Sequence, residues 1–246
     1  MSYSICFVMP AFKRYALSEI TFAQRKLMCN ELADNGIKAD CVVIADDENL
    51  DIAKQYGFHT VERDNEFLGR RFNDGHELAG KLGFDFSTPV GSDMFVDHKL
   101  FVDLEDKFTI TNHYAIVRKD GGNIATMFVD WGILQIIPTR MIKSMDHRPC
   151  AEDIKRGCDT SARNRIKNRL PGKILIPTRK EAHAFECISF QSKQQITSYQ
   201  GLVNTYKAHT FEGETSEVIA PLRKWYPALL LDKMVEYYLS GTSEKL

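Results

Sequence analysis

The sequence lacks the features that mark several classes of protein. Its 246 residues contain no internal repeat, no low-complexity tract and no stretch approaching the ~18 apolar residues of a membrane helix. Residues 1–4 show no charged segment followed by an apolar core, so we expect no signal peptide. These absences predict a protein with no membrane partner and a cytoplasmic location.

Paired cysteines and an excess of charge are also missing. The cysteines stand at Cys6, Cys29, Cys41, Cys150, Cys158 and Cys187, and no two of them form a CxxC pair. This spacing argues against a zinc site and favours free thiols in a reducing compartment. The net charge of −1 excludes a protein coated in positive charge, although it permits a local basic face.

Apolar runs and helical spacings alternate along the first hundred residues. The expected strands are 4–9, 39–45, 59–62 and 84–90, and the expected helices are 17–35, a short one ending at Tyr56, and 70–81. This order is typical of an α/β fold with a mostly parallel, Rossmann-like sheet and helices on both faces. Its last strand leads into Gly91–Asp97, where Asp97 is placed to cap a helix from His98 to about Asp106.

The pattern changes after residue 107 to a mixed α+β half. Strands are expected at 108–111, 114–118, 124–129, 173–176 and 184–189, with helical segments after Pro138, within 151–170, and within 222–239, where Pro227 divides them. We therefore expect residues 1–107 to form a ligand-binding α/β half. Residues 108–240 would be the second half of the same domain, and 241–246 a flexible tail.

Chemistry-bearing residues gather in the loops that follow the four expected strands. These loops are Pro10–Arg14, Asp46–Glu48, Leu68–Gly75 and Gly91–Asp97. In a parallel sheet such loops share one rim, so their side chains should converge. Carboxylates suit Mg²⁺ or Mn²⁺, while arginines and helix N-termini offset phosphate charge. Capping acids and a solvated arginine face remain the alternative interpretation.

The ordered set of these motifs resembles the GT-A class of nucleotide-sugar glycosyltransferases, most closely the short family-2-like members of bacteriophage genomes. The matching pieces are Val8–Pro10, Val43–Glu48, Ala53–Gly57, Leu68–Gly75 and Gly91–Asp93. The resemblance covers about the first hundred residues. It implies a GT-A-like sheet, a nucleotide-diphosphate sugar donor, a divalent metal (Mn²⁺ or Mg²⁺), and a host-cytoplasm location if the protein is viral.

The resemblance also implies roles for individual residues. Asp93 falls on the last Asp of the family's metal motif, whose first acid is replaced here by Gly91. Asp46 or Asp47 falls where the family holds the nucleobase or ribose. The full donor-binding set is Pro10, Ala11, Asp46, Asp47, Arg70, Arg71, Asn73 and Ser92.

The acceptor side is expected in the second half. Such enzymes draw a general base from the region after the metal motif, which implies Asp159, with Asp153 as the other candidate. Trp131 could offer a stacking surface to the acceptor, or be a structural tryptophan. His183 and His209 could complete a metal shell, or be structural histidines.

The segment Lys155–Lys180 is strongly basic. It carries nine Lys or Arg and a single acid, Asp159. Arg163, Arg165, Lys167 and Arg169 would then contact the phosphates of a polyanionic acceptor such as DNA with a hydroxymethylated base. The alternative is a solvated helix face.

Two other functions remain open from the sequence. A nucleotidyltransferase or pyrophosphorylase uses a similar sheet, but normally has a Gly-rich loop after the first strand, where this chain has Pro10–Arg14 without glycine. A non-catalytic nucleic-acid-binding protein would need the basic segment but no acids at the sheet rim.

Overall fold

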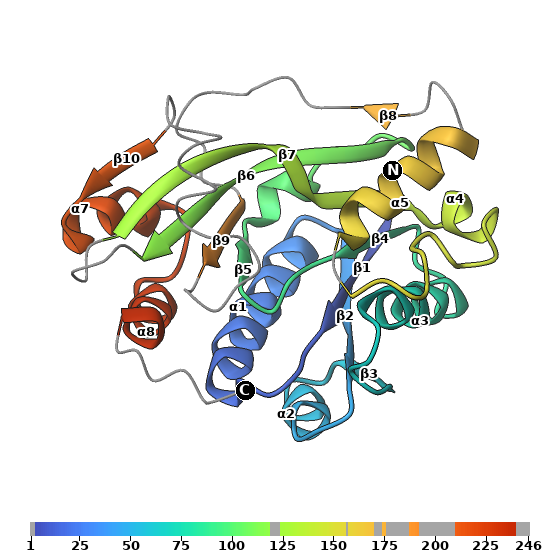
Figure 1. The fold of residues 1–246 in the computed structure, drawn as a ribbon, viewed down its shortest axis with the longest axis horizontal. Helices are drawn as coiled ribbons and strands as arrows, with labels where there is room; N and C mark the ends of the chain where they lie inside the picture. The colour runs from blue at the N-terminus through green and yellow to red at the C-terminus, as the bar shows by residue number, and fades with distance from the viewer. Residues whose placement is uncertain are drawn as a thin grey trace.

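The structure is a computed structural model, and Figure 1 shows its ribbon. It describes residues 3–118, 124–155, 157–169, 174–175, 187–191 and 210–239. Within these ranges, no helix is long and apolar enough to cross a membrane.

The first half is the expected alternation of strands and helices. Its order is β1 (Ser4–Pro10), α1 (Tyr15–Asp34), β2 (Lys38–Ala45), α2 (Asn49–Gln55), β3 (His59–Glu62), α3 (Leu68–Lys81) and β4 (Phe86–Pro89). The four strands are parallel and lie in the order β3-β2-β1-β4. The predicted mainly parallel α/β sheet is therefore confirmed. The three helices were also expected: α1 and α3 begin two residues before their expected starts, and α2 ends one residue before its expected end.

Helices cover both faces of this sheet, which explains why β1 and β2 contain continuous apolar runs. Successive side chains of a strand point to opposite faces. Along β1, Ile5 and Phe7 pack in one cluster with Phe22 of α1, while Cys6 packs in another with Ala79 of α3. In Figure 1, α1 and α3 accordingly lie on opposite sides of the strands.

The second half extends the same sheet with antiparallel pairings. It contains β5 (Met94–Val96), the 3-10 helix η1 (His98–Phe101), β6 (Phe108–Arg118), β7 (Ile124–Pro138), α4 (Thr139–Lys143), α5 (Cys158–Arg169), β8 (Ile174–Leu175), β9 (Cys187–Gln191), β10 (Thr210–Gly213), α7 (Thr215–Ile219), η3 (Ala220–Lys224) and α8 (Ala228–Leu239). β7 runs antiparallel to β4, and the sheet continues through β6 and β9 to β5. The C-terminal α8 packs beside α1 through a cluster that includes Leu17 and Leu231.

Several sequence-based expectations for this half were wrong in detail. The helix expected from His98 to about Asp106 is only the four-residue η1, although Asp97 does cap it by accepting a bond from the Lys99 N–H at 2.8 Å. The two strands expected at 108–111 and 114–118 form one strand, β6, with a register shift between Thr111 and His113. The helix expected within 151–170 begins only at Cys158, because the preceding residues are docked on α3.

Candidate active site

The loops after β1 and β2 are joined to each other at the carboxyl edge of the sheet. The Ala11 N–H donates to the Ile44 carbonyl at 2.9 Å, and the Lys13 N–H donates to Asp47 Oδ2 at 2.6 Å. Asn49 completes the link through Nδ2 to the Lys13 carbonyl at 3.1 Å. The parallel registers bring the loop after β4 to the same rim. The structure thus brings three of the four expected loops together.

The two aspartates after β2 have different surroundings. Asp47 accepts bonds from the backbone N–H groups of Lys13 and Asn49 and from the Asn49 side chain, so its carboxylate holds the two loops in place. Asp46 is exposed, and its carboxylate makes no hydrogen bond to any other residue in the described part of the chain. Of this pair, Asp46 is the one whose oxygens are available to a ligand.

Arg71 lies beneath the rim rather than on it. Its side chain is only 2% exposed, and Nη2 donates to the carbonyls of Ala11 and Ile44, while Nη1 donates to Asn65 Oδ1 at 2.5 Å. Burial lowers the pKa of the guanidinium, and the nearby carboxylates of Asp46 and Asp47 oppose that shift. Arg71 therefore fixes the backbone at Ala11 and Ile44, and its positive charge interacts favourably with Asp46 and Asp47.

Asn73 and Arg70 have partners that their sequence-based roles do not explain. Asn73 is fully buried, with its amide paired to the backbone of Cys150: Oδ1 accepts from the N–H at 2.9 Å and Nδ2 donates to the carbonyl at 3.0 Å. The Arg70 guanidinium lies 4.8 Å from the ring centroid of Phe67, which Lys155 also approaches at 5.6 Å. Asn73 thus holds a distant loop, and Arg70 stays half-buried at the start of α3.

The turn after β4 leaves little room for a side chain at Gly91. A Cβ atom at Gly91 would lie 2.5 Å from Asp93 Oδ1, far inside van der Waals contact, so the Asp93 carboxylate occupies the space that a side chain there would need. Asp93 is half-buried, and Ser92 accepts a bond at Oγ from Arg14 Nη2 at 3.2 Å. The turn offers one carboxylate, with an arginine beside it.

The strand that follows Asp93 is held from both sides. On one side the Phe190 N–H of β9 donates to the Asp93 carbonyl at 2.9 Å. On the other, buried α1 side chains reach alternate carbonyls of β5: Arg25 Nη2 donates to Met94 at 2.8 Å and Gln24 Nε2 donates to Val96 at 2.8 Å. These contacts fix the backbone that carries Asp93. Sequence reasoning missed both residues, because a helical pattern does not show which polar side chain is buried.

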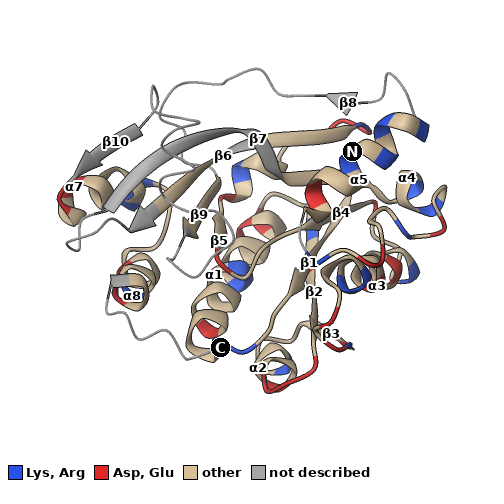
Figure 2. Ribbon diagram, in the orientation of Figure 1, with Lys and Arg blue, Asp and Glu red and all other residues tan. Residues whose placement is uncertain are grey.

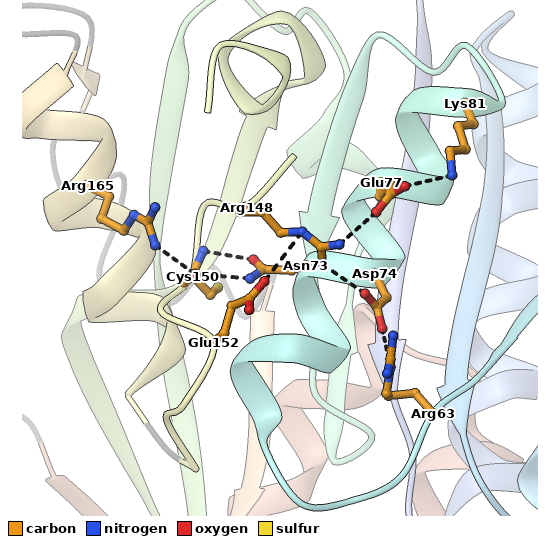
Figure 3. A network of polar contacts seen from close by, with 9 residues as sticks. All are labelled: Arg63, Asn73, Asp74, Glu77, Lys81, Arg148, Cys150, Glu152 and Arg165. Atoms are coloured by element: carbon orange, nitrogen blue, oxygen red, sulfur yellow. Dashed lines mark hydrogen bonds and ion pairs between the residues drawn. The ribbon is translucent and has the colours of Figure 1, made fainter. Parts of the chain in front are cut away.

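A loop of the second half, residues 148–155, is docked on α3 (Figure 3). Two further contacts add to the hydrogen bonds between Asn73 and Cys150. Arg148 forms ion pairs with Asp74 at 2.9 Å and Glu77 at 3.0 Å. The Gly69 N–H donates to the Ile154 carbonyl at 3.1 Å. A Cβ atom at Gly69 would lie 1.8 Å from the Ala151 carbonyl oxygen, so this approach requires glycine. The docked loop carries Asp153, which is exposed.

Asp159 lies in the first turn of α5, half-buried, and Gln135 Nε2 donates to its backbone carbonyl at 2.7 Å. Gln135 belongs to β7, which pairs with β4 through Phe86–Pro138 and Ser87–Ile137. Asp159 is therefore tied to the strand that lies next to β4.

The remaining predicted residues divide into three groups. In α5, Arg165 donates to the Cys150 carbonyl at 2.9 Å and Arg169 to the Ser144 carbonyl at 3.4 Å, while Arg163 and Lys167 have no hydrogen bond or ion pair to another described residue. Figure 2 shows this concentration of Lys and Arg along α5. Trp131 lies in β7, but its side chain is outside the described part of the structure. His183 and His209 lie outside the described residues altogether.

Comparisons with known proteins identify the fold. No protein-family model matches the chain, and no curated protein matches its sequence. Among solved structures, S. aureus TarS 1–349 in complex with UDP matches with a TM-score of 0.52 and 15% identity, over 77% of this chain and 61% of that one. A longer S. aureus TarS structure matches at 0.50 with 16% identity, over 79% and 37%. The chain has the GT-A fold.

A second protein also occurs among the similar structures. Glucosyl-3-phosphoglycerate synthase from Mycobacterium tuberculosis, in complex with Mn²⁺, UDP and glucosyl-3-phosphoglycerate, matches at a TM-score of 0.48 with 14% identity, over 73% of each chain. This chain spans less than two thirds of the TarS chains that it matches. At these identities the likeness concerns the fold, and the chemistry has to be argued from the site.

The residues at the rim fit a metal that arrives with its ligand. No group of three or more His, Cys, Asp or Glu side chains that could hold an ion occurs among the described residues. Mg²⁺ and Mn²⁺ are often bound by one or two carboxylates together with water and substrate phosphates, and need no closed protein cage. The partly exposed Asp93 carboxylate suits such an ion, with the remaining ligands supplied by a diphosphate.

Proposed function

We propose that this protein is a glycosyltransferase that moves a sugar from a nucleotide-diphosphate donor to a hydroxyl group. The observation that carries the proposal is the presence of two aspartates at one edge of the sheet: the exposed Asp46 at the end of β2 and the half-buried Asp93 after β4. The GT-A fold also supports the proposal, because S. aureus TarS, which has a similar fold, was crystallised with UDP.

Different residues at the rim bind different parts of the donor. Asp46 accepts hydrogen bonds from the ribose or base, supported by the buried Arg71 charge beneath it. Asp93 holds the divalent metal, Mn²⁺ or Mg²⁺, at the diphosphate. When bound, that metal would neutralise negative charge as the nucleotide leaves. The backbone of Pro10 and Ala11 forms the floor of the pocket, and Ser92 lies beside the phosphates.

The acceptor enters from the side of α5. Asp159, in the first turn of that helix, is the proposed general base that removes the proton from the acceptor hydroxyl. Asp153 is the second candidate, because it is exposed on the loop docked against α3. Trp131 remains a proposed contact for the acceptor.

The test measures nucleotide binding. Thermal shift and calorimetry with UDP, GDP, CDP and dTDP, with and without Mn²⁺, should show one preferred nucleotide. Ligand at a hundredfold excess over Kd stabilises the native state by about 2.7 kcal/mol. For a chain of this size that corresponds to roughly 5–10 °C. Asp93→Asn should abolish the Mn²⁺-dependent part of this shift.

The matched control is Asp51→Asn. Asp51 is an aspartate of α2 whose side chain is 78% exposed and pairs only with Lys54 among the described residues. This variant should bind nucleotide as the wild type does. If Asp93→Asn and Asp51→Asn behave alike in the presence of Mn²⁺, the metal role of Asp93 is wrong. If no nucleotide shifts the wild type at all, the glycosyltransferase proposal fails.

DNA with a hydroxymethylated base is a second candidate acceptor, on the evidence of the basic face of α5. Two of its four predicted contacts, Arg163 and Lys167, are without a described partner and are available to phosphates, whereas Arg165 and Arg169 already bind carbonyl groups. Duplex binding measured between low and physiological salt tests this candidate. Two phosphate contacts predict that a plot of log binding constant against log salt concentration has a slope of about −2. If the protein binds no duplex at low salt, the acceptor hydroxyl belongs to a glycan, a protein or a small molecule.

A further inference from the structure

Arg14 is a cation at the rim to which the proposed donor site gives no role. Its side chain is half-buried, and Nη2 donates to Ser92 Oγ at 3.2 Å. Among the described residues it forms no ion pair, in contrast to Arg148, which is paired with Asp74 and Glu77 (Figure 3). Arg14 therefore brings a positive charge to the turn that carries Asp93.

The backbone of this loop is held in a conformation that L residues rarely adopt. Lys13 and Arg14 have φ angles of 48° and 49°, in the left-handed region, which is unfavourable for two successive residues with a Cβ atom. The Asp47 carboxylate and the Asn49 amide hold the two backbone groups of Lys13. The neighbouring loop thus maintains the bend that carries Arg14 across to Ser92.

Arg14 reaches the residue next to Asp93, because it donates to Ser92 Oγ. Both act on the Tyr238 phenol of α8, whose pKa is raised mainly by burial and further by Asp93, while Arg14 opposes the rise. Because the Asp93 carboxylate occupies the space above Gly91, a second acid cannot stand there without displacing it. The turn therefore presents one carboxylate and one guanidinium where the resembled motif would present two acids.

We propose that Arg14 binds the diphosphate of the nucleotide directly and supplies part of the charge neutralisation, so that nucleotide binding persists without a metal. A guanidinium can donate two parallel hydrogen bonds to phosphate oxygens, and its charge does not depend on pH in the physiological range. This inference rests on the proposed function, since it assumes that the rim binds a nucleoside diphosphate.

The experiment is calorimetric binding of the preferred nucleoside diphosphate in EDTA and again in Mn²⁺. The wild type should bind in EDTA, and more tightly in Mn²⁺. Arg14→Gln should weaken metal-free binding by about 10- to 100-fold, the range expected for a lost charged hydrogen bond. It should keep the tightening that Mn²⁺ gives. Arg14→Lys should retain part of the metal-free affinity, because it keeps the charge.

Lys13→Gln is the matched control. Lys13 has the same charge and the same left-handed backbone, but its ammonium group lies over the Phe12 ring, 5.2 Å from the centroid. This variant should bind as the wild type does. A melting temperature close to that of the wild type would show that each variant is folded.

The outcomes separate this inference from the proposed function. A wild type that binds nucleotide only with Mn²⁺ would overturn the role of Arg14 and leave the glycosyltransferase proposal standing. Equal metal-free affinity of Arg14→Gln and Lys13→Gln would also overturn it. A wild type that binds no nucleoside diphosphate under either condition would overturn both.

Discussion

Replacing Asn73 by alanine tests whether this residue holds the acceptor-side loop or contacts the donor. In the structure its amide is paired with the Cys150 backbone, at 2.9 Å to the N–H and 3.0 Å to the carbonyl, in a fully buried position. Asn73→Ala removes both bonds. The Cys150 carbonyl keeps the Arg165 guanidinium at 2.9 Å, but the structure offers the Cys150 N–H no second acceptor among the described residues.

The magnitude follows from this asymmetry. A buried N–H left without an acceptor costs about 1–3 kcal/mol, and loss of the second bond adds about 0.5–1.5 kcal/mol. We therefore expect the free energy of unfolding to fall by about 2–4 kcal/mol and the melting temperature by roughly 5–15 °C. Residues 148–155 should also become more susceptible to proteolysis, because the loop loses two of its hydrogen bonds to α3.

Urea unfolding of the wild type and the variant measures the difference. Asn35→Ala is the control: this asparagine also bonds a carbonyl, that of Glu31 at 2.8 Å, but on the exposed end of α1. Its effect should stay within about 0.5 kcal/mol. The double variant with Arg165→Met leaves the Cys150 carbonyl with neither donor, so the two substitutions together should cost more than the sum of the single effects.

One result would refute this reasoning. If Asn73→Ala unfolds at the same urea concentration as the wild type and instead weakens nucleotide binding, then Asn73 contacts the donor, as the sequence suggested, and the pairing with Cys150 contributes little.

Two further predictions concern catalysis and pH. Asp159→Ala should keep nucleotide binding and lose about 10²–10⁴-fold in transfer rate, measured by release of the nucleoside diphosphate, and normal turnover would move the base to Asp153. His76 is fully buried against Ser87, and burial lowers its pKa from 6.5 to about 3, with His147 adding to the shift. Between these two values only the unfolded chain takes up the proton, so stability should be complete above about pH 6.5 and fall by about 1.4 kcal/mol per pH unit below it. His76→Gln should lack this part of the slope in urea titrations at several pH values, and identical slopes for both proteins would contradict the assignment.

The sequence by itself determined the sheet and its rim. The apolar runs of β1 and β2 are continuous because both faces are covered, and the glycines at 36 and 83 lie just beyond the ends of α1 and α3 with positive φ. These signals are local, so they can be read without knowing the contacts. Since parallel strands end at one edge, the convergence of Asp46 and Asp93 on that edge also follows from the order of elements alone.

Only the tertiary structure decided which polar residues are free to act. Arg71, Asn73 and Arg165 look like ligand contacts in the sequence, yet their polar groups bind backbone carbonyls or N–H groups of distant segments. Asp46 and Asp47 are adjacent in sequence, and the hydrogen bonds from Lys13 and Asn49 distinguish the structural carboxylate of Asp47 from the exposed Asp46. A side chain's role depends on which distant backbone group lacks a partner, and this is fixed when the loops pack together rather than by the residue's own neighbours in the chain.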